Sequence, residues 1–307
     1  MGVIAVLERA SGRRISRLKF RENIEGWLFI APVVFGMAAF QFFPIAVSIY
    51  ASFTDWDGVN PARFVGLDNY IRLFTNDMYF VMTLKNTLYY TFGHIPLTIL
   101  CALLLALLCN RKMKGVTWYR TFYFTPVVTN TVAISLVWYW IYAPDVGVLN
   151  WLLSLIGIKG PAWLSEQAWA MPAVILVSVW HGVGYPMVIL LAGLQNIPEV
   201  LYEAAAIDGA GTWHKFWHVT LPLLTPSLFF LLITQFISSF QVFGLIFVMT
   251  QGGPAFATTV YVYYLYQNAF AWWKMGYAAA MAWILFVIVA SVTFIQWKLQ
   301  RKWVFYG

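Results

Sequence analysis

The side chains of this chain that could do chemistry include four histidines and two cysteines. His214 and His218 stand four residues apart and could share one helix face, but the glutamate of an H-E-x-x-H zinc motif is missing. Cys101 and Cys109 lie eight residues apart in one apolar segment, about 12 Å along a helix, which is too far for a disulfide. We therefore expect no metal site, and no nucleophile converges with a base as an enzyme would require.

Amides and hydroxyls gather in one apolar segment, about 221–247, where they fill an arc of roughly 160° on a helix. One interpretation is hydrogen bonding between helices, the usual role of such side chains in membrane bundles. The other is contact with a solute, since amides, hydroxyls and aromatic faces suit a sugar. The arc consists of Thr234, Gln235, Ser238, Ser239 and Gln241. The candidates for a substrate path are Gln235, Ser238, Ser239, Phe240, Gln241 and Asn130.

Two histidines, His94 and His181, lie within the apolar segments. His181 lies in "WHGVGYP", where the glycines would let another helix approach, so we expect a structural hydrogen bond ahead of solute contact. No Asp, Glu, Lys or Arg stands in the middle of a span, which weighs against a proton-driven carrier. His94 and His181 keep that alternative open. An uncharged path favours a neutral solute.

The elements that must position these side chains are membrane helices. The 307 residues are 61% hydrophobic and 10% charged, against about 25% charged residues in a soluble domain. Each apolar run can cross ~30 Å of hydrocarbon at ~1.5 Å per residue. We predict an all-α polytopic protein, with residues 1–26 and 299–307 outside a transmembrane domain of 27–298. The six spans are expected at about 27–51, 81–109, 119–142, 169–193, 221–247 and 274–298.

The lysines and arginines predict the orientation of the chain. Of the 19, 14 would lie on one side of the membrane, so both termini should be cytoplasmic. The net charge of +7 is then mainly a topology signal, and nucleic acid is not expected as a partner. The 14 are Arg9, Arg13, Arg14, Arg17, Lys19, Arg21, Arg111, Lys112, Lys114, Arg120, Lys215, Lys298, Arg301 and Lys302.

The cytoplasmic loop at about 194–220 contains the most distinctive stretch, "EVLYEAAAIDGAGTWHK" (199–215). Pro198 suits the first turn of a short helix with small, apolar side chains. Gly209 and Gly211 would end that helix, and a left-handed backbone is expected at Gly209. Thr212 could cap a second short helix.

This loop resembles the EAA motif in the permease subunits of binding-protein-dependent ABC importers. The matching residues are Glu203, Ala204, Ala205, Asp208, Gly209 and Ala210, followed by Leu221-Pro222. "FVGLDNY" (64–70), "TQGGP" (250–254) and the six spans resemble the carbohydrate-type permeases of the maltose and glycerol-3-phosphate families. The chain lacks the extra N-terminal spans of the large maltose subunit, so it resembles the shorter, six-span type.

The resemblance implies a type I importer permease bundle in a prokaryotic cell membrane. The loop would be a coupling helix that docks on an ATPase, and the solute would be a mono- or oligosaccharide or a related polyol. The partners would be a second permease subunit, two ATPase copies, an extracytoplasmic solute-binding protein and the lipid bilayer. No G-x-x-x-x-G-K-[ST] phosphate loop occurs, so ATP and magnesium would be bound by the ATPase, and this chain would hold no cofactor. The alternatives are a stand-alone carrier or channel for a neutral solute and an intramembrane enzyme.

Overall fold

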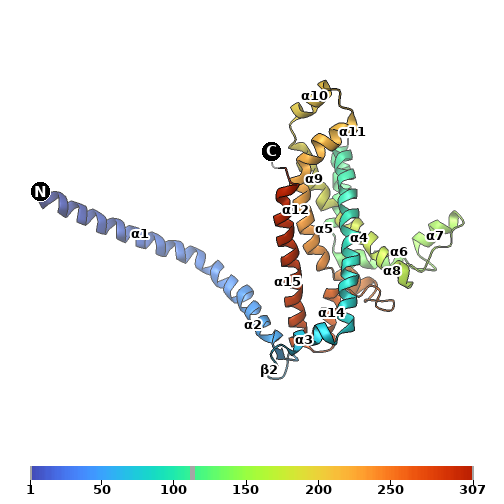
Figure 1. The fold of residues 1–307 in the computed structure, drawn as a ribbon, viewed down its shortest axis with the longest axis horizontal. Helices are drawn as coiled ribbons and strands as arrows, with labels where there is room; N and C mark the ends of the chain where they lie inside the picture. Colours follow the sequence, from blue (N-terminus) through green and yellow to red (C-terminus); the bar gives the residue numbers. More distant parts are fainter. Residues whose placement is uncertain (1, 111–114, 306–307) are drawn as a thin grey trace.

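Long apolar helices dominate the structure, a computed structural model that describes the backbone of residues 2–110 and 115–305 and the side chains from residue 19 onward (Figure 1). Arg111, Lys112 and Lys114, which contribute to the charge asymmetry, lie outside the described residues. Four described helices are long and apolar enough to cross a membrane, or six spans if each of two bent helix pairs counts as one. The long segments are α1 (Gly2–Met37) continued by the π-helical turn η1 (Ala38–Phe42) and α2 (Phe43–Ser52), then α4 (Met78–Cys109), α12 (Leu221–Phe240) and α15 (Met275–Leu299).

Two predicted spans are broken rather than straight. α5 (Val116–Val128) and α6 (Thr131–Ile141) meet at 99°. α8 (Gln167–Gly182) and α9 (Gly184–Gln195) meet at 48°. The fifth predicted span also breaks, because α12 ends at Phe240 and α13 (Gly244–Met249) follows after three residues. Composition placed these segments correctly, but it does not register the bends.

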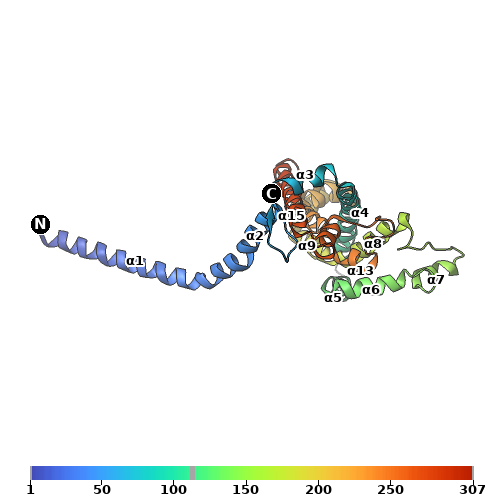
Figure 2. The ribbon, with the colours of Figure 1, turned by 90° about the horizontal axis from the view of Figure 1, so that it is seen from below.

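The first helix stands away from the other helices (Figures 1 and 2). The most apolar window of Lys19–Ser52 is 0% buried. Only its far end is anchored, where α2 packs against α15 and Gly276 lies under the backbone of Ala51 and Thr54. A Cβ on Gly276 would collide with Thr54 O and stand 3.0 Å from Ala51 O. The missing Cβ of Gly276 thus allows α15 to approach this backbone closely.

The remaining helices pack around α4, which contacts α8, α9 and α12. Small residues on one face of α4, Ala102 and Ala106, are fully buried against a cluster that includes Leu190 and Leu224. Because these side chains are small, the backbones of α4, α9 and α12 come close together.

Short elements occupy the two ends of the bundle (Figure 1). At one end lie α10 (Glu199–Ile207), α11 (Thr212–Lys215) and the π-helical turn η2 (Phe216–Thr220), with η4 (Gln300–Lys302) in the tail. At the other end lies α3 (Asp68–Thr75), a short amphipathic helix. The other connecting elements are β1 (Thr54–Asp55), β2 (Arg63–Phe64), α7 (Val148–Leu155), α14 (Tyr261–Tyr266) and the π-helical turn η3 (Gln267–Ala271), β1 and β2 forming an antiparallel pair.

Candidate functional site

The loop helix α10 has a sharply defined end. Gly209 has φ +79°, which confirms the left-handed backbone expected there. The N–H of Ala210 donates to Ala205 O at 2.8 Å, and the N–H of Gly209 donates to Ala206 O at 3.1 Å. These two bonds form a Schellman motif, which satisfies carbonyl groups that a helix end leaves without partners. The chain can therefore turn sharply into α11.

The start of α11 differs from the expectation. Gly211 is the N-cap, with an extended backbone, and the helix makes no side-chain capping bond. The prediction that Thr212 caps α11 is wrong, because Thr212 is already the first helical residue. Gly211 therefore serves as a spacer between two helix ends.

The surface of α10 faces away from the bundle. Ile207 is 87% exposed, and Val200 and Leu201 are exposed as well. Of the six residues of the EAA pattern, Glu203, Ala204, Asp208 and Gly209 are exposed and Ala205 and Ala210 half-buried. An exposed helix with apolar side chains, three of them alanines, and two carboxylates, Glu199 and Glu203, is a surface that a partner protein could cover.

One side chain of α10 links it to the membrane part. The Tyr202 hydroxyl lies 3.0 Å from the Thr220 hydroxyl, and Thr220 also donates to Lys215 O at 3.3 Å. Thr220 is buried at the end of η2, which runs directly into α12. The Tyr202–Thr220 contact therefore joins α10 to the residue that directly precedes α12.

The polar arc on α12 divides into residues with different partners. Gln235 lies in hydrogen-bond distance of His94 on α4 (Oε1 to Nε2, 3.3 Å), as interhelical bonding predicts. Ser238 donates to the carbonyl of Thr234 in its own helix. Ser239 is buried and, among the described residues, its hydroxyl has no partner. Phe240 is buried beside Phe236, and Gln241 is exposed at the C-cap of α12.

The helix breaks between α5 and α6, between α8 and α9, and between α12 and α13 lie close together. At the first, His181 Nε2 on α8 donates to Thr129 O at 3.3 Å, a carbonyl that the end of α5 frees. Asn130 caps α6 by accepting a bond from the Val132 N–H at 2.8 Å. The expectation of a structural hydrogen bond for His181 is confirmed.

The other two breaks are close to the first. A Cβ on Gly184, at the α8–α9 break, would stand 2.5 Å from Tyr123 O of α5. A Cβ on Gly244, at the α12–α13 break, would stand 3.3 Å from Thr131 Cγ2 at the start of α6. Non-helical backbone at membrane depth is tolerated where it is buried in protein or lines a water-filled cavity.

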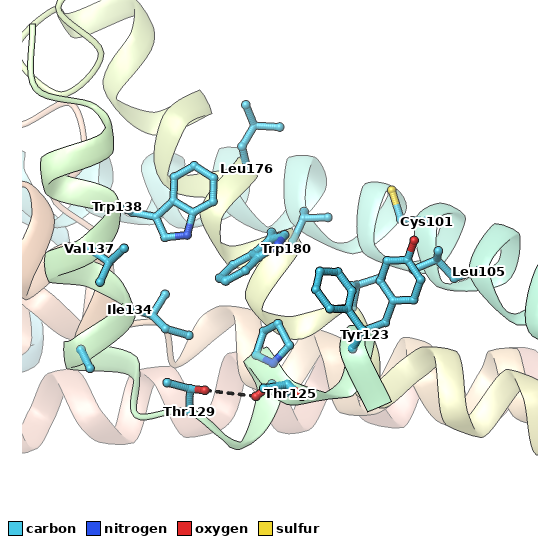
Figure 3. A pocket seen from close by; sticks show the side chains of 15 residues that line it. Cys101, Leu105, Tyr123, Thr125, Thr129, Ile134, Val137, Trp138, Leu176 and Trp180 are labelled. Atoms are coloured by element: carbon cyan, nitrogen blue, oxygen red, sulfur yellow. Dashed lines mark hydrogen bonds between the residues drawn. The ribbon is translucent and has the colours of Figure 1, made fainter. Parts of the chain in front are cut away.

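A cavity of about 660 Å³ lies beside these breaks, between α4, α5, α6 and α8 (Figure 3). Its walls carry Trp138 and Trp180, whose rings meet edge to face with centroids 5.4 Å apart. Tyr123, Thr125 and Thr129 line the same space. Sequence patterning selected neither Trp138 nor Trp180 as a site residue; the available signal was a tryptophan in each of two neighbouring predicted spans.

Comparison with known proteins identifies the family. A family model described as "Binding-protein-dependent transport system inner membrane component" matches residues 94–304. The chain belongs to this family. It is 38% identical to a probable ABC transporter permease protein, YesP, of Bacillus subtilis, over 97% of each chain. It is 35% identical to the lactose transport system permease protein LacF of Rhizobium radiobacter, over 94% of this chain and 97% of the relative.

A further relative and a solved structure agree with this assignment. The trehalose/maltose transport system permease protein MalF of Thermococcus litoralis is 34% identical over 93% of this chain and 97% of its own length. The fold matches a chain of a bacterial ABC transporter that imports the acidic polysaccharide alginate, with a TM-score of 0.80, 22% identity, and coverage of 94% and 99%. The chain is therefore a multi-pass inner-membrane permease of the sugar ABC transporter type, with the fold of an ABC importer permease.

Proposed function

We propose that this chain is one transmembrane subunit of an ATP-driven importer that carries a mono- or oligosaccharide, or a related polyol, into the cytoplasm. The observation that carries the proposal is α10, an exposed helix that ends in a Schellman motif at Gly209 and is tied to α12 through Tyr202 and Thr220. Glu203, Ala204, Ala205, Asp208, Gly209 and Ala210 form the surface that docks on the ATPase. ATP and magnesium are bound by that ATPase, present in two copies, and this chain performs no covalent chemistry.

The exposed first span supports a second permease subunit as partner. The most apolar window of this helix is 0% buried, so most of its surface is left for lipid or for another chain. A second, similar subunit that receives this helix would bury it and enclose a path between the two chains. The solute-binding protein would deliver the sugar at the end of the bundle opposite α10. Both termini of the chain would be cytoplasmic.

The proposed solute path runs beside the three helix breaks. The side chains of Asn130 and Gln241 are exposed beside them, and backbone groups freed from helices offer further hydrogen bonds. The rings of Trp138 and Trp180 supply aromatic faces of the kind that sugars contact. Of the candidates on α12, Gln241 remains a residue of the proposed path. Gln235, Ser239 and Phe240 pack against other helices and would support the path without contacting the solute. Ser238 is exposed and remains a candidate.

The mechanism follows from the connections of α10. When the ATPases close on ATP, they displace α10, and the Tyr202–Thr220 contact carries the displacement into η2 and α12. Because α12 is interrupted at 241–243, its far end can move relative to α13. The broken helices α5–α6 and α8–α9 would then open the path alternately to either side.

Affinity purification of the tagged chain from its native membrane, followed by native mass spectrometry, tests the assembly. We expect a second permease, two ATPase copies and a bound sugar or polyol. The complex should hydrolyse ATP faster when the loaded binding protein is added. Transport by the chain reconstituted alone, with no ATPase present, would favour the stand-alone carrier or channel instead.

A further inference from the structure

A second pocket, of about 390 Å³, lies at the end of the bundle opposite α10. It is formed by residues of α3, α14, η3 and the starts of α4 and α15. Figure 1 shows α3 and α14 at that end. Its polar walls include Arg72, Asn76, Asp77, Asn268, Trp272 and Lys274. It is separate in its lining residues from the aromatic cavity beside the helix breaks.

The carboxylate of Asp77 forms a fixed part of this pocket. Its Oδ1 accepts bonds from the N–H groups of Tyr79 at 2.9 Å and Phe80 at 3.1 Å, which caps α4. Its Oδ2 accepts bonds from the hydroxyls of Tyr264, at 2.8 Å, and Tyr277. A carboxylate has about four acceptor positions, so Asp77 is saturated. Burial, together with the bond to Asp77, raises the pKa of Tyr264, which keeps its hydroxyl protonated as a donor.

The two cations of the pocket, Arg72 and Lys274, each lie over an aromatic ring. The guanidinium of Arg72 lies 5.2 Å from the ring centroid of Tyr277, and Lys274 Nζ lies 5.7 Å from that of Trp272. Within the part of the chain that the structure describes, neither forms a salt bridge. Arg72 and Lys274 are both exposed. The pocket thus offers two positive charges beside a carboxylate whose acceptor positions are already used.

We propose that this pocket receives an acidic side chain, aspartate or glutamate, of the solute-binding protein. The inference rests on the proposed function, which places the binding protein at this end. Charge complementarity selects the partner group, because guanidinium and ammonium donors form their strongest hydrogen bonds with a carboxylate. The pocket lies at the low end of the volume range of ligand sites, which suits one side chain and leaves no room for a whole phospholipid. Such charge pairs set the rate and register of docking.

The test uses the complete transporter and the binding protein of the same system, identified by co-purification and then expressed separately. A carbodiimide forms a zero-length amide between a lysine amine and a carboxylate that touch, with loss of water to the reagent. We expect a cross-link between Lys274 and an acidic residue of the binding protein, located by peptide mass spectrometry. Lys274→Arg should abolish the cross-link but keep ATPase stimulation, since the charge remains.

Kinetics supply the second readout. Arg72→Gln combined with Lys274→Gln should raise the KM for the binding protein in ATPase stimulation by about tenfold or more, with basal hydrolysis unchanged. The difference should shrink as salt screens the charges. Lys159→Gln, which removes an exposed lysine that does not line the pocket, is the matched control and should leave KM unchanged. Arg72→Lys should retain most of the affinity and checks that the loss is not misfolding.

Several results would overturn the inference. A KM within twofold of the wild type in the double variant would contradict the docking role of the pocket. A cross-link that forms through a residue other than Lys274 would contradict it as well. An effect that appears only in nanodiscs containing phosphatidylglycerol, and not in neutral ones, would assign the pocket to an anionic lipid headgroup. If the binding protein does not stimulate even the wild-type complex, the proposed function itself fails. That outcome differs from one in which the wild type is stimulated and the variants are stimulated equally well, which overturns only the docking role of the pocket.

Discussion

Replacing Gly209 by alanine separates backbone conformation from packing at the coupling helix. A Cβ at Gly209 or at Gly211 would meet no heavy atom within 4 Å, so neither substitution creates a clash. The two glycines differ in conformation: Gly209 has φ +79°, whereas Gly211 has φ −71° and ψ 172°. Gly211→Ala is therefore a matched control that adds the same methyl group without left-handed strain.

The magnitude follows from this difference. An alanine in the left-handed region costs about 1–2 kcal/mol, which changes a local equilibrium by a factor of about 5–30. The Schellman end of α10 should therefore fray in Gly209→Ala and leave the EAA surface in its docking geometry for a smaller fraction of the time. Gly211→Ala should cost less, because it adds no left-handed strain and only replaces the glycine N-cap of α11 by alanine. Gly209→Asn should recover part of the loss, because asparagine tolerates this backbone better than alanine.

Sugar-stimulated ATPase activity of the purified complex, with permease content checked by blot, measures the effect. We expect Gly209→Ala to lower stimulation several-fold at normal permease content, and Gly211→Ala to lower it less. Equal activity in the two variants would show that the backbone at Gly209 does not control coupling. A loss in Gly211→Ala alone would refute the reasoning altogether.

Three further substitutions have expected outcomes. Gly276→Ala should reduce the amount of folded permease, measured by fluorescence size exclusion, because its Cβ would collide with the backbone that follows α2; normal yield would contradict this packing. Tyr202→Phe should lower ATP-coupled uptake by removing the bond to Thr220, a cost of about 0.5–1.5 kcal/mol, and unchanged uptake would exclude this route of coupling. Gln235→Ala should lower the melting temperature in detergent, because His94 loses one of its two side-chain hydrogen-bond partners; a lower affinity for sugar without loss of stability would instead restore Gln235 to the solute path.

Much of the fold was predictable because hydrophobic length is a strong signal. The positions of the spans follow from it, and the left-handed turn at Gly209 follows from a glycine after a short alanine-rich helix. The 99° bend between α5 and α6 was not predicted, because the average hydrophobicity of a segment does not depend on the direction of its helix axis. A local signal was present in Asn130, a good N-cap residue, within a segment otherwise assigned to one span.

The second pocket was not predictable for a different reason. Asp77 and Tyr277 are 200 residues apart in the sequence, and Asp77 and Tyr264 are 187 apart. Each has a sufficient local explanation, as a helix cap or as an interfacial tyrosine, so no pattern links them. Only the packing of α14 against α4, and of α15 against α3 and α14, brings these groups together.

Photo-cross-linking from α10 tests most directly whether this helix docks on an ATPase. Ile207, 87% exposed, would be replaced by p-benzoylphenylalanine in the assembled complex, and Trp151 on α7, also exposed, would be replaced in a control. We predict that light attaches the ATPase to the chain through position 207 and not through position 151, and that the yield changes when ATP is added. A cross-link to lipid alone from position 207, with the ATPase present in the complex, would contradict the coupling role of α10.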